Sequence, residues 1–588
     1  MNQVKNVNSF LFLYLPYLLF FLVSFVYFGF FADYIGFYQE KSSLFLFSNE
    51  YLAQNLHQPG GFLVYLGKLF TAFFYYPVLG SLFISSVFCL IVFLISRIIS
   101  FLSGSNSLFI PLMAGVALFF LQTNYQYLFH NSLALMLQLA LFYLTIRYMK
   151  GWLPVIITPV WYFITGGFTW IFFLMYILYQ IFFIGGKGWY KIIALTGLVA
   201  LFLYISKEFL FFQSLRTLLV FPYSNTDIGG QFKLFIPVAG FISILPLISR
   251  IKLRFRFAGR IPIIVIKLIA ISIPVCLLII TSILRFDLKT RQYFQVEKMF
   301  YDNRFDDIIA YNTDNPSNNI LTIYLNNISL CETGKLNDML FHFRQSPDGQ
   351  TLFLKWEMYW EILRRGGYFY YTVGMINEAH RWAFENMVMR GHSPEGLKML
   401  IKTELINGNY SMADKYISLL DKSLFYGKYA RAFGKYLFDD GVVFSDPELG
   451  EKRLIKIEND FFSITDDPYS NIELLLSGDS LNKKAFEYKL AFLMLRKDYD
   501  GIANEIPKLE RCGFEKLPVH VEEVAMTYQA MNEGILPDTG NLRIDERTTI
   551  RFNQFLQTLH FYNDNLNAAE PVMKQRFGNT FWYYTLYL

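Results

Sequence analysis

The chain has 588 residues, of which 54% are hydrophobic, 19% aromatic and only 17% charged. This composition, with a mean hydropathy of +0.32, excludes one ordinary soluble domain and predicts an integral membrane protein. Residues 1–284 contain 17 Lys and Arg against 5 Asp and Glu, whereas the remainder contains 35 against 42. We therefore expect a transmembrane domain over 1–284 and a separate domain over 285–588. The net charge of +5 is the balance of these halves, and no basic aromatic patch indicates nucleic-acid binding.

Apolar runs of roughly spanning length follow one another in the first half. They cover about 10–31, 78–96, 108–123, 131–147, 153–166, 168–184, 190–205, 232–249 and 262–284. A helix needs roughly 20 apolar residues to cross the hydrocarbon core, so several runs are short, and the fifth and sixth are also compatible with a single re-entrant unit. The sequence predicts an all-α, polytopic helical membrane domain with about nine spans.

The charges in the connections between these runs segregate by side. Connections on the side of the N-terminus contain eleven Lys and Arg and no carboxylate, with a basic cluster over residues 250–260, whereas the opposite side has every acid of this half. Short connections rich in Lys and Arg are retained in the cytoplasm, so we expect the N-terminus to be cytoplasmic. An odd number of spans then places residues 285–588 in the periplasm, if the protein lies in a bacterial inner membrane.

The long connection from Ala32 to Pro77 is the first candidate for chemistry. It holds three of the five carboxylates that precede Asp287, together with Lys68 and a Pro-Gly-Gly turn at residues 59–61. A long and partly polar loop between apolar spans must either fold onto the membrane surface or line a cavity. We expect the loop on the outer face.

Motifs of soluble enzymes are missing from the sequence. It has no Walker loop, no dinucleotide fingerprint, no His-Glu-x-x-His, no Gly-x-Ser-x-Gly and no Cys-x-x-Cys pair. The sequence therefore predicts no cofactor and leaves metal dependence open. No acidic residue lies deep in an apolar run, which argues against a proton or sodium pump.

The second half contains a short repeat. Gly374-x-Ile376-x-x-Ala379-x-x-Trp382 recurs 34 residues later as Gly408-x-Tyr410-x-x-Ala413-x-x-Tyr416, and less exactly from Asn303 and from Gly334. This pattern resembles tetratricopeptide repeats, in which a small residue of one helix packs against an aromatic residue of the next. We expect an all-helical solenoid that binds a protein or glycan, with an irregular stack of helical hairpins as the alternative.

The order of features in the first half resembles the polytopic C-type glycosyltransferases. Asp33 follows the first run directly, Glu50 comes 17 residues later, and an apolar segment from Phe62 to Phe74 ends in Tyr-Tyr-Pro. That superfamily shares a first span, a long outer loop that opens with an acid, surface helices on that loop and many further spans. The likeness covers about the first 290 residues and rests on layout.

A closer resemblance extends over the whole chain. The combination of Pro-Gly-Gly-Phe, Tyr-Tyr-Pro-x-Leu-Gly and the ending Phe-Gly-Asn-Thr-Phe-Trp-Tyr-Tyr is similar to an uncharacterised bacterial family of multi-pass membrane proteins. This likeness implies no activity.

The glycosyltransferase resemblance implies a role for individual residues. Asp33 would be the general base that activates an acceptor hydroxyl, with Glu50 as a second catalytic carboxylate. The phosphate of a polyprenyl-phosphate-linked sugar would be bound by the outer cations and a histidine, which are Arg216, Lys207, Lys68 and His130. The alternative is that each carboxylate marks a solvated interface and each cation a surface pair or a snorkelling side chain. Asp33 is followed by Tyr34, where many members of the superfamily have a second acid.

Three functional hypotheses follow. The first is transfer of a sugar from a lipid carrier on the outer face. The second is a non-enzymatic scaffold that recruits envelope proteins through the repeat domain, and the third is a flippase for lipid-linked saccharides or another transporter. Nine spans and a long first loop exceed what an anchor needs, which favours the first over the second.

Overall fold

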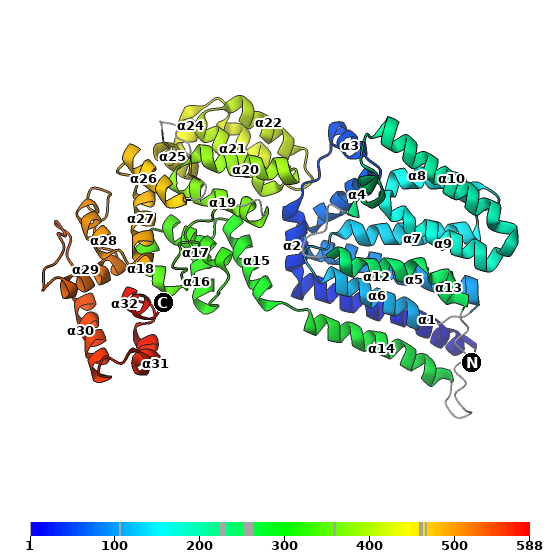
Figure 1. Cartoon of the computed structure of the whole chain (residues 1–588), viewed down its shortest axis with the longest axis horizontal. Coiled ribbons are helices and arrows are strands. Elements are labelled where there is room, and N and C mark those ends of the chain that lie inside the picture. Colours follow the sequence, from blue (N-terminus) through cyan, green and yellow to red (C-terminus); the bar gives the residue numbers. More distant parts are fainter. Residues whose placement is uncertain are drawn as a thin grey trace. The chain divides into compact units, whose positions relative to one another are not determined.

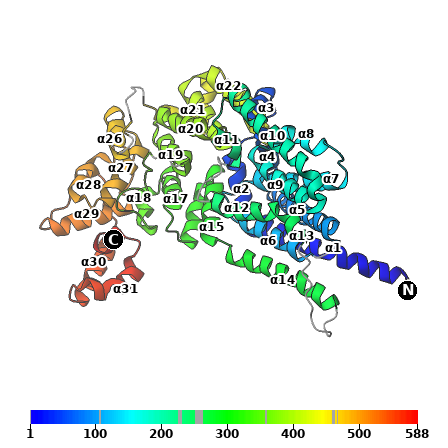
Figure 2. The same cartoon turned by 45° about the vertical axis from the view of Figure 1, so that its right-hand side comes forward.

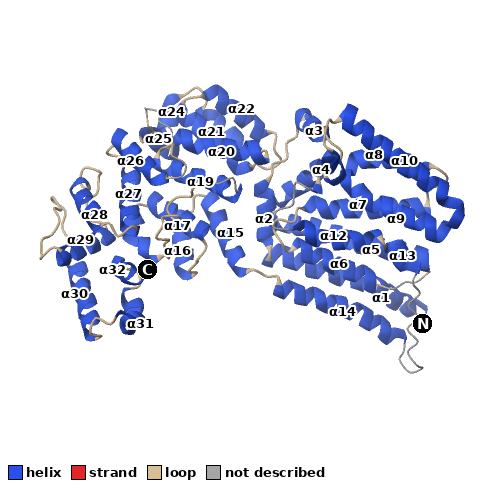
Figure 3. Cartoon of the chain, in the orientation of Figure 1, coloured by secondary structure: helices blue, strands red, loops and turns tan. Residues whose placement is uncertain are grey.

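The fold is described from a computed structural model of the chain. The structure describes residues 2–104, 108–223, 231–250, 263–356, 360–457, 463–464 and 467–588. Most of the basic cluster at 250–260, and Asp227 of the outer side, lie outside these residues. The described residues are helical with no strand, and Figure 3 shows helices and connecting loops throughout. One isolated bridge joins Leu46 and Ser423. The predicted all-α class is confirmed.

The chain forms two compact units. The first comprises Met1–Asp287 together with the short segment Lys422–Phe425, and the second comprises Leu288–Asp421 and Tyr426–Leu588. We call these the membrane unit and the helical unit.

The membrane unit consists of long apolar helices and short connecting ones. In chain order the helices are α1 (Asn2–Val26), α2 (Asp33–Ser42), α3 (Asn49–Leu56), α4 (Gly61–Ala72), α5 (Pro77–Ser103), α6 (Phe109–Gln122), α7 (Phe129–Arg147), α8 (Leu153–Thr165), α9 (Thr169–Tyr179), α10 (Trp189–Ile205), α11 (Leu215–Val220), α12 (Gln231–Ser243), α13 (Leu245–Arg250) and α14 (Ile263–Leu284). A π-helical turn over Tyr27–Phe31 links α1 to α2. Proline at the first position starts α5, and Gly104 ends it with a φ of +69°.

Five helical stretches of the described chain are long and apolar enough to cross a membrane. They are Tyr14–Phe31, Pro77–Ser103, Phe129–Arg147, Leu153–Ile184 and Trp189–Leu210, with a sixth if the bent pair Leu268–Leu284 and Leu288–Tyr301 counts as one span. The protein is therefore a multi-pass membrane protein, with fewer unambiguous spans than the nine apolar runs. The 14 residues of α6 rise only about 21 Å against roughly 30 Å of hydrocarbon, and α12 is shorter still.

Helix α5 is the centre of the membrane unit. It packs against α1, α6, α7 and α13, and α1, α5 and α6 run side by side in Figures 1 and 2. Its buried face includes Phe88, Ile91 and Val92, each fully buried, while Leu90 and Phe93 are exposed. Apolar side chains on the exposed face of such a helix are expected to contact lipid, so this face needs no protein neighbour.

The helical unit consists of helices joined by short turns. They are α15 (Leu288–Tyr301), α16 (Phe305–Asp314), α17 (Ile320–Glu332), α18 (Leu336–Met339), α19 (Trp360–Val373), α20 (Ile376–Arg390), α21 (Pro394–Asn407), α22 (Tyr410–Asp421), α23 (Gly427–Phe433), α24 (Asp440–Ser445), α25 (Pro447–Leu454), α26 (Pro468–Gly478), α27 (Lys483–Leu495), α28 (Tyr499–Glu505), α29 (Val519–Met531), α30 (Glu546–Phe561), α31 (Leu566–Phe577) and α32 (Phe581–Tyr587). Helices α19 to α22 pack successively, each against the next in the chain.

The repeat identified in the sequence marks the turns of this unit. Gly374 lies between α19 and α20 with a φ of +91°, and Gly408 lies between α21 and α22 with a φ of +77°. This backbone conformation favours glycine, which explains its place at the start of each repeat. A Cβ atom on Gly366 of α19 would lie 2.1 Å from the Trp382 ring of α20, so a small residue of one helix does receive the aromatic residue of the next.

Candidate functional site

The first connection of the membrane unit folds into three helices that pack onto the bundle. Helix α2 packs on α5, and α4 packs on α7 and α8. The Ser48 side chain caps α3 by accepting a hydrogen bond from Tyr51 N at 3.1 Å. The connection is therefore an ordered part of the membrane unit.

The Pro-Gly-Gly turn before α4 crosses two other segments at close range. Gly60 donates its N–H to Phe163 O at 2.8 Å, and a Cβ atom on Gly60 would lie 2.8 Å from Pro222 Cδ. A Cβ atom on Gly166 would lie 2.5 Å from Phe221 O. Both glycines have positive φ, at +86° and +59°. Only glycine allows the three backbones to approach this closely, and the crossing fixes where α4 begins.

Buried amide side chains tie α2 to the turn between α6 and α7. Gln39 Nε2 donates to Tyr127 O at 2.9 Å, and Gln39 Oε1 accepts from Phe129 N at 3.2 Å. Gln122 Nε2 donates to the same Tyr127 oxygen at 3.1 Å. These bonds satisfy backbone groups at the start of α7, and they hold the loop helix against the end of the bundle.

Lys68 and His130 meet where α4 crosses the start of α7. A Cβ atom on Gly67 would lie 2.4 Å from His130 Cβ, which measures how closely the two helices approach. The Lys68 ammonium lies 5.5 Å from the centroid of the Tyr51 ring and interacts electrostatically with His130. Burial lowers the pKa of Lys68. Within the described parts of the chain, no carboxylate lies within ion-pair distance of this ammonium.

Two polar atoms at the start of α7 also have unused hydrogen-bonding capacity. His130 is 7% exposed and Asn131 is 1% exposed. His130 Nε2 and Asn131 Oδ1 are buried without a hydrogen-bond partner among the residues the structure covers. A half-buried cation close to an unpartnered imidazole nitrogen is an arrangement that an anion, such as a phosphate, would complete. We call Lys68, His130 and Asn131 the loop polar site.

The two predicted catalytic carboxylates lie at helix starts. Asp33 is the first residue of α2 and is partly exposed, with no hydrogen bond to its side chain from the described residues. Glu50 is exposed in the first turn of α3. Hydrogen bonds from its own backbone N–H and from Ser48, together with the charge of Lys422, lower the pKa of Glu50. These hydrogen bonds engage the carboxylate of Glu50, whereas that of Asp33 accepts none from the described residues.

The other two predicted phosphate ligands lie on exposed positions. Arg216 is exposed on α11, and Lys207 pairs with the neighbouring Glu208 in the π-helical turn Ser206–Leu210. Among the described residues the structure gives no contact of either side chain with Asp33, Lys68 or His130. It brings together Lys68 and His130 from the predicted set, and leaves the rest separate.

Sequence reasoning missed Gln39, Gln122 and Asn131. Charged residues are rare inside the apolar runs, and the buried polar groups here are mainly uncharged hydroxyls and amides. The signal was present, because a Gln or Asn beside or within an apolar run marks a position that faces protein.

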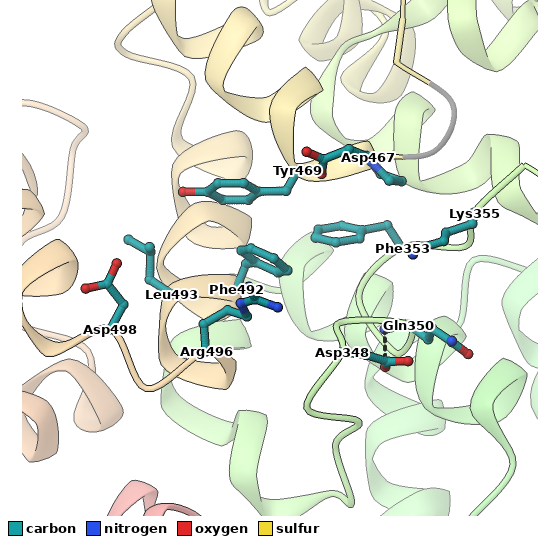
Figure 4. A pocket seen from close by; sticks show the side chains of 11 residues that line it. Asp348, Gln350, Phe353, Lys355, Asp467, Tyr469, Phe492, Leu493, Arg496 and Asp498 are labelled. Atoms are coloured by element: carbon teal, nitrogen blue, oxygen red, sulfur yellow. Dashed lines mark hydrogen bonds between the residues drawn. The ribbon is translucent and has the colours of Figure 1, made fainter.

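The cavities among the described residues of the helical unit include two of small-molecule size. One has a volume of about 350 Å³ and is lined by α15, α17, α19, α21, α23 and α25. The other, of about 470 Å³, is shown in Figure 4, where Phe353, Tyr469 and Phe492 form an aromatic floor. Exposed Asp348, Lys355 and Arg496 stand at its rim. We call these the inner cavity and the rim cavity.

A comparison with protein families matches residues 8–588. The chain belongs to a family of unknown function (DUF6057). This agrees with the likeness to an uncharacterised membrane-protein family over the whole length. No curated protein and no solved structure matches the chain. Over the described residues, no group of three or more His, Cys, Asp or Glu side chains is arranged to hold a metal ion.

Proposed function

We propose that the protein transfers a sugar from a polyprenyl-phosphate carrier to an acceptor hydroxyl on the outer face of the membrane. The observation that carries this proposal is the loop polar site. Lys68 is a cation whose pKa burial lowers, without a carboxylate partner in the described chain, and it interacts electrostatically with His130, whose Nε2 has no hydrogen-bond partner among the described residues. A phosphate group at this position would compensate the charge of Lys68 and use the free hydrogen-bonding capacity of His130.

The proposed reaction assigns one task to each group. The acceptor oxygen forms a bond to the anomeric carbon of the sugar as the bond from that carbon to the carrier phosphate breaks. Asp33 takes the proton of the acceptor hydroxyl, because an ionised carboxylate can accept it as the new bond forms. Lys68 compensates the negative charge left on the phosphate, and His130 donates a hydrogen bond to it.

The layout of the membrane unit supports the same proposal. The loop after the first span folds into surface-type helices, as in the C-type glycosyltransferases that the sequence resembles. Segregation of charges in the connections favours an outer position for this loop and for the helical unit. The helical unit, with its tetratricopeptide-like turns, would then bind or position an acceptor.

Binding of the carrier tests the phosphate site. Full-length protein in nanodiscs is titrated with undecaprenyl phosphate, and bound carrier is measured by native mass spectrometry. We expect Lys68→Ala to weaken binding about tenfold, the effect of losing one charge-assisted contact of about 1.4 kcal/mol. The matched control is Lys150→Ala, which removes an exposed lysine of the opposite predicted side. Equal binding by wild type and Lys68→Ala would contradict the proposal.

Turnover tests the base. Proteoliposomes are loaded with lipid-linked sugars extracted from the membranes of the source organism, and release of the polyprenyl phosphate is followed by mass spectrometry. We expect Asp33→Asn to lower the rate by about 100-fold or more, the usual contribution of a general base. Glu50→Gln, a change of the same kind at an exposed helix start, is expected to retain most activity.

A non-enzymatic scaffold is the second candidate, favoured by the successive packing of α19 to α22 in the helical unit. In this case the helical unit recruits partners and the membrane unit anchors it. Asp33→Asn would then leave the cellular phenotype unchanged, whereas the transfer proposal predicts the phenotype of a deletion with the protein still folded and inserted.

A further inference from the structure

The inner cavity has a wall of aromatic rings. Phe300 and Tyr368 pack edge to face with centroids 5.0 Å apart, and Tyr301 lies 6.1 Å from Tyr368. Tyr371 and Tyr429 also line the cavity from α19 and α23. Tyr301, Tyr368 and Tyr429 are each partly exposed, so ring surface remains open to a ligand.

The charged residues of the inner cavity are already paired with one another. Lys402 Nζ lies 2.6 Å from Glu448 Oε1, which also accepts a hydrogen bond from Tyr371 at 2.9 Å. Lys398 Nζ lies 3.0 Å from Glu395 Oε1.

A third ion pair lies deepest in the cavity. Lys452 is 1% exposed, and its Nζ lies 2.9 Å from Glu332 Oε1. Three lysines and four glutamates line the cavity in all, the fourth glutamate being Glu451. The charges nearly cancel, so an ionic ligand would find little uncompensated charge in the cavity.

Paired charges still offer hydrogen bonds. An ammonium has three donors and a carboxylate about four acceptor positions, so the single ion pairs of Lys398 and Lys402 occupy only part of them. Lys452 also donates to Thr372 O at 3.1 Å. The cavity thus presents both donors and acceptors beside partly exposed aromatic rings, with the Lys398 ammonium 4.9 Å from the centroid of the Tyr429 ring. Its volume of about 350 Å³ lies in the range of small-ligand sites.

We infer that the inner cavity binds a saccharide. A sugar is neutral, carries adjacent hydroxyl groups that both donate and accept, and has apolar C–H faces that pack on aromatic rings. Each of these properties has its counterpart in the lining. The inference goes beyond the proposed transfer reaction, because it concerns the other unit and holds whether or not the membrane unit is an enzyme.

A peptide fits this cavity less well. The lining elements are helices, whose backbone groups bond internally, so an extended peptide would find no strand edge to pair with. An anion or cation would have to displace the existing ion pairs. A neutral polyhydroxylated ligand can add its bonds to these pairs without breaking them.

Saturation-transfer NMR on the full-length protein in nanodiscs tests the inference. The probes are chitotriose, cellotriose, maltotriose and mannotriose, each at roughly 1 mM, a concentration suited to a ligand that binds weakly. We expect transfer to the C–H protons of at least one trisaccharide. The variant is Tyr429→Ala, which removes one ring of the cavity, and Tyr429→Phe keeps the ring.

The rim cavity provides a matched control. Tyr429 stacks on Phe433 with centroids 4.6 Å apart, and Tyr469 of the rim cavity stacks on Phe492 at 4.2 Å. Tyr429→Ala should weaken binding at least tenfold, while Tyr469→Ala and Tyr429→Phe should change it by less than threefold.

Three outcomes would overturn the inference. One is the absence of transfer to all four trisaccharides. Another is equal weakening by Tyr429→Ala and Tyr469→Ala, which would place the sugar elsewhere. The third is binding of a pool of tryptic casein peptides, but of no trisaccharide, with the same sensitivity to Tyr429→Ala. Circular dichroism of each variant verifies that the unit remains folded.

Discussion

The two units treat buried polar groups in different ways. In the membrane unit most of these groups are uncharged, as where Gln138 donates to Thr165 Oγ1 at 3.0 Å and accepts from Trp161 Nε1 at 2.9 Å. In the helical unit full charges are buried together, as where Arg365 Nη2 lies 2.6 Å from Glu297 Oε1 with both side chains fully buried. An isolated charge costs most where water and partners are both distant, so a membrane unit is expected to use amides and hydroxyls. The buried charges Glu40 and Lys41 of the membrane unit are paired with each other, with Lys41 Nζ 3.7 Å from Glu40 Oε2, whereas the half-buried Lys68 has no carboxylate partner among the described residues.

The charge cluster of the helical unit joins two of its helices. Glu297 belongs to α15 and Arg365 to α19, and Arg365 also pairs with Glu361 one turn away. Burial alone would raise the pKa of Glu297, but the charges of Arg365 and Arg364 outweigh burial and lower it. Glu297 and Arg365 are too far apart in the chain for a local sequence pattern to predict that they pair.

The largest effect is expected from breaking this cluster. Glu297→Gln leaves Arg365 buried with only part of its compensation, and we expect a loss of about 3–5 kcal/mol in the free energy of unfolding. Denaturant unfolding of the detergent-solubilised protein, followed by circular dichroism, measures it. Asp307→Asn removes the acid of an exposed pair with Arg304, and should cost less than about 1 kcal/mol. Similar losses in the two variants would contradict the comparison.

Glu487 of α27 gives the second effect, which depends on pH. Burial raises its pKa to about 7, with Lys483 and Lys484 opposing and Asp338 adding to the shift. Because the folded pKa exceeds the unfolded value of 4.5, its contribution to stability is complete below that value and is lost as the pH rises toward 7. Glu487→Gln should remove roughly 2–3 kcal/mol of pH dependence over this window.

Unfolding midpoints of wild type and Glu487→Gln between pH 4.5 and 8 measure this difference. The exposed Glu515→Gln is the matched control and should follow the wild-type profile. Parallel profiles for wild type and Glu487→Gln would show that this carboxyl is not the group that titrates.

The third prediction concerns the approach of α4 to α7 in the membrane unit. Gly67→Ala places a Cβ atom 2.4 Å from His130 Cβ, so the helices must separate. We expect a loss of about 1–3 kcal/mol and weaker carrier binding, because Lys68 moves with α4. On α10, Gly197 has no atom within 4 Å of such a Cβ, so Gly197→Ala should not destabilise. Thermal unfolding in detergent compares the two variants.

The smallest effect on stability is expected at Asp33. The carboxylate lies at the start of α2 without a hydrogen bond from the described residues, so Asp33→Asn should cost less than about 1 kcal/mol through the helix dipole. The same change is expected to abolish transfer. A large loss of stability in this variant would mean that Asp33 is structural and would remove the basis for its proposed role.

Much of the fold could be predicted because it depends on local pattern. Apolar runs predicted the membrane helices, and the glycines at 374 and 408 predicted the turns of the helical unit. The structure has fewer unambiguous spans than the nine apolar runs because α6 and α12 are shorter than the hydrocarbon core is thick. The length of such a helix does not show whether it crosses the membrane. Of the candidate site, Lys68 and His130 were identified as residues but not as neighbours.

The sequence by itself determined that this is an all-helical membrane protein with a second, charged helical part, because hydrophobic content and periodicity are properties of neighbouring residues. Tertiary structure alone decided which polar groups meet. Gly67 brings Lys68 beside His130, residues 62 positions apart, and Glu297 meets Arg365 from another helix. Which side chains meet depends on the angle and position at which two helices cross. The packing of whole helix faces sets that crossing, and a short stretch of sequence does not determine it.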